Sequence, residues 1–181
     1  MDVIRAKTAG FCMGVGLALQ KLDTALEQPC EGRTCTLGPI IHNPQVLADY
    51  EALGVFCAQD PSQLNATDRV LIRAHGITRQ VEEAVRATGA DVVDATCPNV
   101  TRIQKLAARA GEEGRTFVLI GEARHPEVMA IASYCPGTVV LDGPEAAEKY
   151  AADPDSMAFN CYFLGGVDKF VMDGHTITGL D

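Results

Sequence analysis

The chain has 181 residues with 24 Asp and Glu against 15 Lys and Arg, and its formal net charge of −9 argues against a nucleic-acid binder. Hydrophobic residues make up 47% and charged residues 22%, a balance typical of a globular protein with one domain or two small ones. No stretch approaches the roughly 20 apolar residues of a membrane span, and the charged residues 1–7 do not form a signal peptide, so we expect a cytoplasmic protein without a membrane partner.

Short apolar strands alternate with helices along the chain. Leu19, Leu22 and Leu26 have helical spacing, and Pro44 and Pro98 stand where a first helical turn tolerates proline. Strands are predicted over residues 2–7, 34–37, 69–73, 91–94, 116–120 and 138–141. Helices are predicted over residues 15–26, 44–53, 78–87, 98–110, 126–134 and 145–151. This order predicts mostly parallel sheets with helices on both faces, in which ligands gather at the carboxyl ends of the strands.

The chain also repeats itself. Cys12 and Cys97 each precede a predicted helix that contains Gln-Lys-Leu, and they are 85 residues apart. His42 and His125 each follow a predicted strand within a Gly-x-x-x-His segment, and they are 83 residues apart. Two coincidences at nearly one offset predict a duplicated, three-layer α/β unit. We expect a first unit over residues 1–95, an incomplete second unit over 96–155 and an atypical tail over 156–181.

The seven cysteines are an odd number, and no two have Cys-x-x-Cys spacing. That pattern disfavours both a disulfide framework and a zinc ribbon. Cys12 and Cys97 stand out because a cysteine at a helix N-terminus faces the positive end of the helix dipole, which favours the thiolate, a ligand for soft metals and iron–sulfur clusters. The alternative is that both are buried structural thiols.

Three of the four histidines follow predicted strands: His42, His75 and His125. Imidazoles beside helix N-termini suit a phosphate or diphosphate, whereas the structural alternative is helix capping or a core histidine. Glu127 follows His125 in the first helical turn. It is either a favourable partner of the helix dipole or a proton donor to a substrate.

Five short motifs then occur in one order and one spacing. They are residues 9–15 (Ala-Gly-Phe-Cys-Met-Gly-Val), 41–43 (Ile-His-Asn), 73–76 (Arg-Ala-His-Gly), 94–98 (Asp-Ala-Thr-Cys-Pro) and 125–128 (His-Pro-Glu-Val). Together they resemble the 4-hydroxy-3-methylbut-2-enyl diphosphate reductase family, over about residues 1–155. The resemblance implies three similar α/β units around a central [4Fe–4S] cluster, of which this chain holds the first two and lacks the third.

The resemblance also implies a role for each candidate site residue. Cys12 and Cys97 match two of three cluster-ligating cysteines, His42, His75 and His125 match the histidines that contact the diphosphate, and Glu127 matches the carboxylate that supplies protons. The implied reaction is a two-electron reductive dehydroxylation that yields isopentenyl and dimethylallyl diphosphate in the non-mevalonate pathway. A ferredoxin- or flavodoxin-type donor would supply the electrons.

The chain departs from the family pattern after about residue 155. No family motif is recognisable in residues 156–181, and Cys161 lacks the expected surroundings of the third ligand. The sequence therefore predicts a truncated enzyme that holds its cluster poorly or not at all. Two alternatives remain: a non-catalytic module that binds a diphosphate, and a zinc site formed by Cys12, Cys97 and a histidine.

Overall fold

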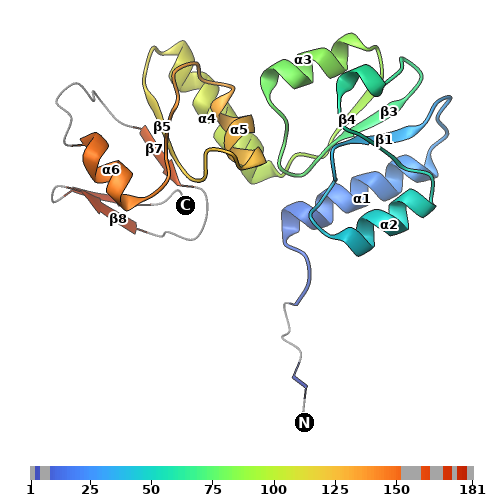
Figure 1. The fold of residues 1–181 in the computed structure, drawn as a ribbon, viewed down its shortest axis with the longest axis horizontal. Helices are drawn as coiled ribbons and strands as arrows, with labels where there is room; N and C mark the ends of the chain where they lie inside the picture. The colour runs from blue at the N-terminus through green and yellow to red at the C-terminus, as the bar shows by residue number, and fades with distance from the viewer. Residues whose placement is uncertain (1–2, 5–8, 152–159, 164–168, 173–174, 179–181) are drawn as a thin grey trace. The chain divides into compact units, whose positions relative to one another are not determined.

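The computed structural model describes residues 3–4, 9–151, 160–163, 169–172 and 175–178 (Figure 1). The chain forms two compact units that are not consecutive in the sequence. Unit 1 comprises residues 1–74 and 84–99, and unit 2 comprises residues 75–83 and 100–181.

Unit 1 is built on a four-stranded sheet in which every neighbouring pair is parallel. The order across the sheet is β2 (Phe56–Ala58), β1 (Thr34–Leu37), β3 (Arg69–Ile72) and β4 (Asp91–Asp94). A 3₁₀ turn, η1 (Pro61–Gln63), precedes β3. Val70 and Leu71 of the central strand β3 are fully buried, as expected for a strand covered on both faces.

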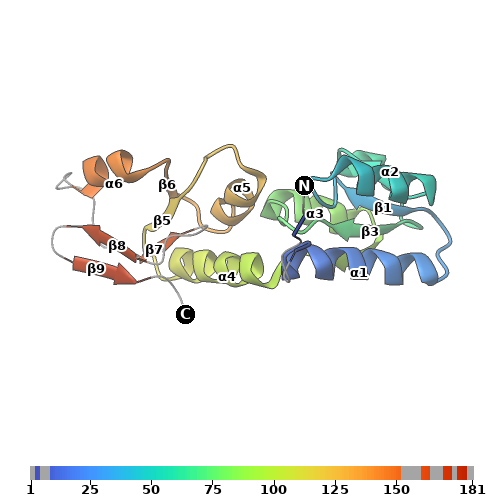
Figure 2. The same ribbon diagram turned by 90° about the horizontal axis from the view of Figure 1, so that it is seen from below.

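Helices α1 (Met13–Glu27) and α2 (Pro44–Ala52) cover one face of this sheet, and the unit 1 part of α3 (Arg79–Ala87), residues 84–87, lies on the other (Figures 1 and 2). The buried residues of α1 include Ala18, Leu22 and Ala25, whose spacing of four and three makes one helical stripe. This stripe packs with Leu71 of β3 and with partly buried side chains of α2 in one hydrophobic cluster. The carboxyl ends of β1 and β3 therefore lead into loops held by a packed core.

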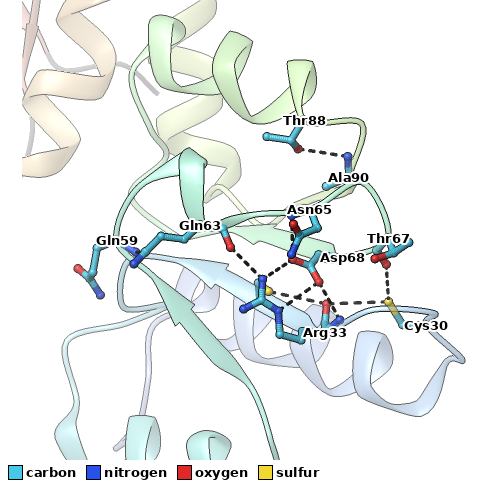
Figure 3. A network of polar contacts seen from close by, with 10 residues as sticks. Cys30, Arg33, Gln59, Gln63, Asn65, Thr67, Asp68, Thr88 and Ala90 are labelled. Carbon is cyan, nitrogen blue, oxygen red and sulfur yellow. Dashed lines mark hydrogen bonds and ion pairs between the residues drawn. The ribbon is translucent and has the colours of Figure 1, made fainter.

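Asp68 anchors the start of β3 to the start of β1 (Figure 3). Its side chain is 2% exposed and accepts hydrogen bonds from the Arg33 guanidinium at 2.7 Å and from the backbone N–H of Arg33 and Asn65 at 2.9 and 3.0 Å. Arg33 also donates to the Gln63 carbonyl at 2.8 Å. One buried carboxylate thus accepts from the residue that precedes β1 and from the loop before β3.

Unit 2 contains a smaller sheet, again wholly parallel. Its strand order is β6 (Val139–Leu141), β5 (Phe117–Ile120) and β7 (Asn160–Phe163). The helices of this part of the chain are α4 (Pro98–Glu112), α5 (Pro126–Ala132) and α6 (Pro144–Ala151), and β8 (Lys169–Met172) and β9 (His175–Thr178) form an antiparallel pair. Val118, Leu141 and Ala147 form a cluster that holds α6 against β6.

The α/β class with mostly parallel sheets is confirmed, and each predicted helix is present within a few residues of its expected bounds. The prediction of a strand over residues 2–7 is wrong for its described part, because Val3 and Ile4 have no regular structure and are more than 90% exposed. The rest of that segment lies outside the described residues. The prediction missed β2, whose three residues are too few to show a period. Most of the tail, 156–181, also lies outside the described residues.

Candidate functional site

Cys12 stands at the N-terminus of α1 with its thiol exposed. It is the N-cap residue, in an extended conformation, and its side chain makes no capping hydrogen bond. Its carbonyl accepts the Gly16 N–H at 2.9 Å and so starts the helical ladder. The backbone of Cys12 therefore serves the helix while its sulfur remains available to a ligand.

Cys97 stands in the corresponding place before α4, in the turn that follows β4. Its N–H donates to the Ala74 carbonyl at 2.9 Å, and the Thr96 N–H donates to the Asp94 carboxylate, also at 2.9 Å. These bonds fix the turn between the strand and Pro98, the first residue of α4. The Cys97 side chain is half-buried and forms no disulfide.

Gly14 brings the two cysteine segments together. A Cβ atom at position 14 would lie 2.5 Å from the Cys97 sulfur and 2.9 Å from its Cβ, well inside van der Waals contact. The Cys97 sulfur therefore packs against the first turn of the helix that Cys12 caps. The structure places both predicted cluster ligands in one region of unit 1. Among the described side chains, however, no three His, Cys, Asp or Glu residues form a group that could hold a metal ion.

His75 and His125 form a pair in unit 2. Their ring centroids are 5.7 Å apart and the rings are nearly perpendicular, at 88°. His75 follows β3 and its Nδ1 atom is buried. His125 is the N-cap of α5, and its Nδ1 atom accepts the Glu127 N–H at 3.3 Å. That hydrogen bond requires the proton of a neutral His125 ring to reside on Nε2, which leaves Nε2 as a donor.

Glu127 lies in the first turn of α5 and is half-buried. Burial raises the pKa of its carboxyl above the ordinary value, and the nearby His125 partly offsets this increase. A carboxyl group that keeps its proton to higher pH is better suited to donate it. The geometry is therefore compatible with the predicted proton donor.

His42 is exposed and lies in unit 1, between β1 and α2. The next residue, Asn43, caps α2 by accepting the Gln45 and Val46 N–H groups at 3.1 and 3.2 Å. The Asn43 cap thus fixes the end of the loop between β1 and α2, and with it the position of the adjacent His42. His42 belongs to unit 1, and the His75–His125 pair belongs to unit 2.

Arg73 is a half-buried cation that the sequence analysis did not assign. It follows β3, and a Cβ at Gly38 would lie 3.0 Å from its Nη1 atom. Gly38 has a φ of +71°, so both the backbone conformation and the close guanidinium favour glycine there. Burial lowers the pKa of Arg73. The sequence signal for Arg73 is its position in the motif of residues 73–76. In that motif only the imidazole of His75 was predicted to have a role.

The sequence of this chain matches a known protein family. A family model described as LytB protein matches residues 3–164. The chain belongs to the LytB protein family. The match passes the predicted limit near residue 155 and includes β7, whose backbone pairs with β5.

Curated members of the LytB family confirm the resemblance seen in the motifs. The chain is 63% identical over 148 residues to the 4-hydroxy-3-methylbut-2-enyl diphosphate reductase of Desulfovibrio desulfuricans, covering 79% of this chain and 52% of the relative. It is 48% identical over 181 residues to the reductase of Oleidesulfovibrio alaskensis, covering 99% of this chain and 62% of the relative. The chain thus spans 52% and 62% of the length of these two relatives.

Solved structures of LytB relatives agree. The structure of (E)-4-hydroxy-3-methyl-but-2-enyl diphosphate reductase, the terminal enzyme of the non-mevalonate pathway, matches with a TM-score of 0.67 and 39% identity, over 78% of this chain and 51% of that chain. A Plasmodium falciparum reductase matches with a TM-score of 0.74 at 23% identity, over 87% of this chain and 49% of that chain, and supports the fold alone. No described helix combines the length and hydropathy needed to cross a lipid bilayer.

Proposed function

We propose that this chain contributes to the reduction of 4-hydroxy-3-methylbut-2-enyl diphosphate to isopentenyl and dimethylallyl diphosphate, as a cytoplasmic iron–sulfur reductase. In this reaction two electrons and two protons enter, the allylic C–O bond breaks, the hydroxyl leaves as water and a C–H bond forms. The observation that best supports the proposal is the contact between the Cys97 sulfur and Gly14, because Gly14 lies two residues after Cys12 in the first turn of α1.

Cys12 and Cys97 would hold a [4Fe–4S] cluster through two of its irons. When bound, the cluster would supply the electrons and a Lewis-acidic iron for the substrate hydroxyl. The described residues fit two thiolate positions and provide no third ligand, so we expect the chain to bind the cluster weakly. A ferredoxin- or flavodoxin-type donor would reduce it.

The imidazoles of His42, His75 and His125 would bind the diphosphate. His125 has the clearest support, because its Nδ1 is engaged by the Glu127 N–H and its Nε2–H can donate to a phosphate oxygen. Glu127 would then hold the proton that the reaction consumes, in a half-buried setting that raises its pKa. Residues at the N-terminus of α5 would thus both bind the diphosphate, through His125, and supply the proton, through Glu127.

The proposal is tested by anaerobic reconstitution of the full chain with iron and sulfide, followed by iron and sulfide assays and electron paramagnetic resonance. We expect less than one cluster per chain, and at least a fivefold loss of bound iron in Cys12→Ser and in Cys97→Ser. Cys57→Ser is the matched control, since Cys57 is also an exposed, free thiol of unit 1. Equal iron in Cys12→Ser and the parent chain contradicts the proposal.

The two rival functions give different results in the same preparation. Tight calorimetric binding of an isoprenoid diphosphate to metal-free protein, lost in His125→Ala and with no reductase activity after reconstitution, indicates a binding module. Stoichiometric zinc without acid-labile sulfide indicates a zinc site. Turnover of the substrate with a reduced viologen dye, dependent on Glu127, supports the reductase.

A further inference from the structure

Unit 1 contains a cavity of about 310 Å³ between the β2 edge of its sheet and helices α1 and α2. Its walls are mostly apolar, and Leu22, Ile40, Leu47, Val55 and Phe56 supply them. A volume of this size is at the lower end of small-molecule pockets and corresponds to roughly ten non-hydrogen atoms, at about 30 Å³ each. None of the residues proposed for the reductase site lines it.

Thr36 gives the cavity a polar side chain. It is the one β1 residue that lines the cavity, as expected from the alternation of side chains along a strand. Thr36 is 3% exposed as a residue, and its side chain carries a hydroxyl group. A molecule in the cavity that hydrogen-bonds to this hydroxyl would bind more tightly than a molecule of the same shape that cannot.

The other polar groups at the cavity define which molecule fits. Cys57 pairs with Thr36 in the β1–β2 ladder and is exposed at the rim. The Tyr50 hydroxyl donates to Asp23 at 2.7 Å, so its proton is already used. Glu51 lines the cavity and is exposed, and the chain carries a net charge of −9, so an anion is disfavoured.

We propose that this cavity binds a small, neutral, mainly apolar molecule whose single hydroxyl or carbonyl group hydrogen-bonds to Thr36. The site is independent of the proposed reductase function, because it shares no residue with the cysteines, histidines or Glu127. Its ligand is also chemically unlike a diphosphate. Failure of either proposal therefore leaves the other intact.

The first test titrates the ¹⁵N-labelled full chain with 4-ethylphenol, a neutral probe of nine non-hydrogen atoms. We expect saturable shifts of amide signals from β1, β2 and α2, with a Kd below about 1 mM, as ligand efficiencies of small fragments allow. The anion 4-ethylbenzoate should bind at least tenfold more weakly. Absence of saturable binding by 4-ethylphenol overturns the proposal.

A pair of tryptophan variants tests the location. The chain has no tryptophan, so a single one reports on its own surroundings. Leu47→Trp should fill the cavity, give blue-shifted emission and weaken 4-ethylphenol binding at least tenfold. Leu53→Trp is the matched control near the end of the same helix, where Leu53 is 66% exposed, and it should change the Kd by less than twofold. Equal binding by both variants overturns the location.

Thr36→Val tests the hydrogen bond, because valine keeps the shape and removes the hydroxyl. We expect a three- to tenfold weaker Kd for 4-ethylphenol and no change for 4-ethyltoluene, in which a methyl group replaces the hydroxyl. Because valine has nearly the same shape as threonine, we expect the Thr36→Val variant to fold. An unchanged Kd for 4-ethylphenol contradicts the role of Thr36.

Discussion

The side chain at position 14 determines how closely the Cys97 sulfur approaches α1. Gly14 is buried within the helix and has no positive φ, so glycine is required there by space and not by backbone conformation. Glycine inside a helix usually lowers stability by roughly 0.5–1 kcal/mol relative to alanine. This cost is offset here by the close packing of Cys97.

We expect Gly14→Ala to destabilise the chain by about 1–3 kcal/mol, because the added methyl group overlaps the Cys97 sulfur. Gly16→Ala is the matched control two residues along the same helix, where a Cβ would meet nothing within 4 Å, and it should stabilise by up to about 1 kcal/mol. Urea unfolding followed by circular dichroism measures both. If the two variants unfold at the same urea concentration, the proposed close approach is wrong.

At the scale of elements, α2 begins where the loop after β1 ends, and its start is defined by three adjacent residues. Asn43 caps the helix, Pro44 occupies the first turn with its φ already suited to a helix, and His42 precedes both. The capping side chain satisfies two N–H groups that the helix itself leaves without partners. The position of His42, which we propose binds the substrate, therefore depends on the neighbouring Asn43 cap.

Replacing the cap should weaken α2. We expect Asn43→Ala to lower the free energy of unfolding by about 1 kcal/mol, because the Gln45 and Val46 N–H groups lose their acceptor. Asn43→Ser should stay close to the parent chain, since serine caps about as well as asparagine. Chemical denaturation of the three proteins in parallel provides the comparison. A loss in Asn43→Ser equal to that in Asn43→Ala would show that the cap is not the cause.

At the scale of the whole molecule, acid stability depends on Asp68 more than on the many exposed carboxylates. The Arg33 guanidinium holds the pKa of Asp68 well below its usual range, against the opposing effect of burial. A lowered pKa in the folded state means that the stabilisation is fully present above the unfolded value of about 3.9 and is lost as the pH falls toward the folded value. Unfolding should therefore set in below about pH 4.

We expect Asp68→Asn to cost about 2 kcal/mol at pH 7, because charged hydrogen bonds to Arg33 and to two backbone groups are weakened. The difference from the parent chain should shrink as the pH falls from 4 to 2, because the Asp68 carboxyl then becomes protonated in the unfolded chain while it stays charged in the folded one. Asp91→Asn is the control: Asp91 pairs with Arg69 at 2.8 Å but is 61% exposed, so its loss should cost less than about 1 kcal/mol. Thermal unfolding across this pH range tests both variants, and a pH-independent difference for Asp68→Asn contradicts the assignment.

The sequence predicted most of the elements because local signals define them. The stripe on α1 and the prolines at the starts of α2, α4 and α5 are readable from neighbouring residues. Strand β2 was missed because Phe56–Ala58 is too short for a period and is stabilised by pairing with β1. Val3 and Ile4 were predicted as a strand because they are apolar, but β-branched residues form a strand only when another strand pairs with them.

The linear sequence by itself determined the family, the α/β class and the set of candidate residues, because motifs and periodicity are properties of neighbours along the chain. Only the tertiary structure decided that the Cys97 sulfur packs on Gly14, that Arg33 reaches Asp68, and that Thr36 faces a cavity. These contacts join segments separated by 30 or more residues or depend on which face of a sheet a side chain occupies. Strand register and helix packing create such proximity, and no local pattern encodes it.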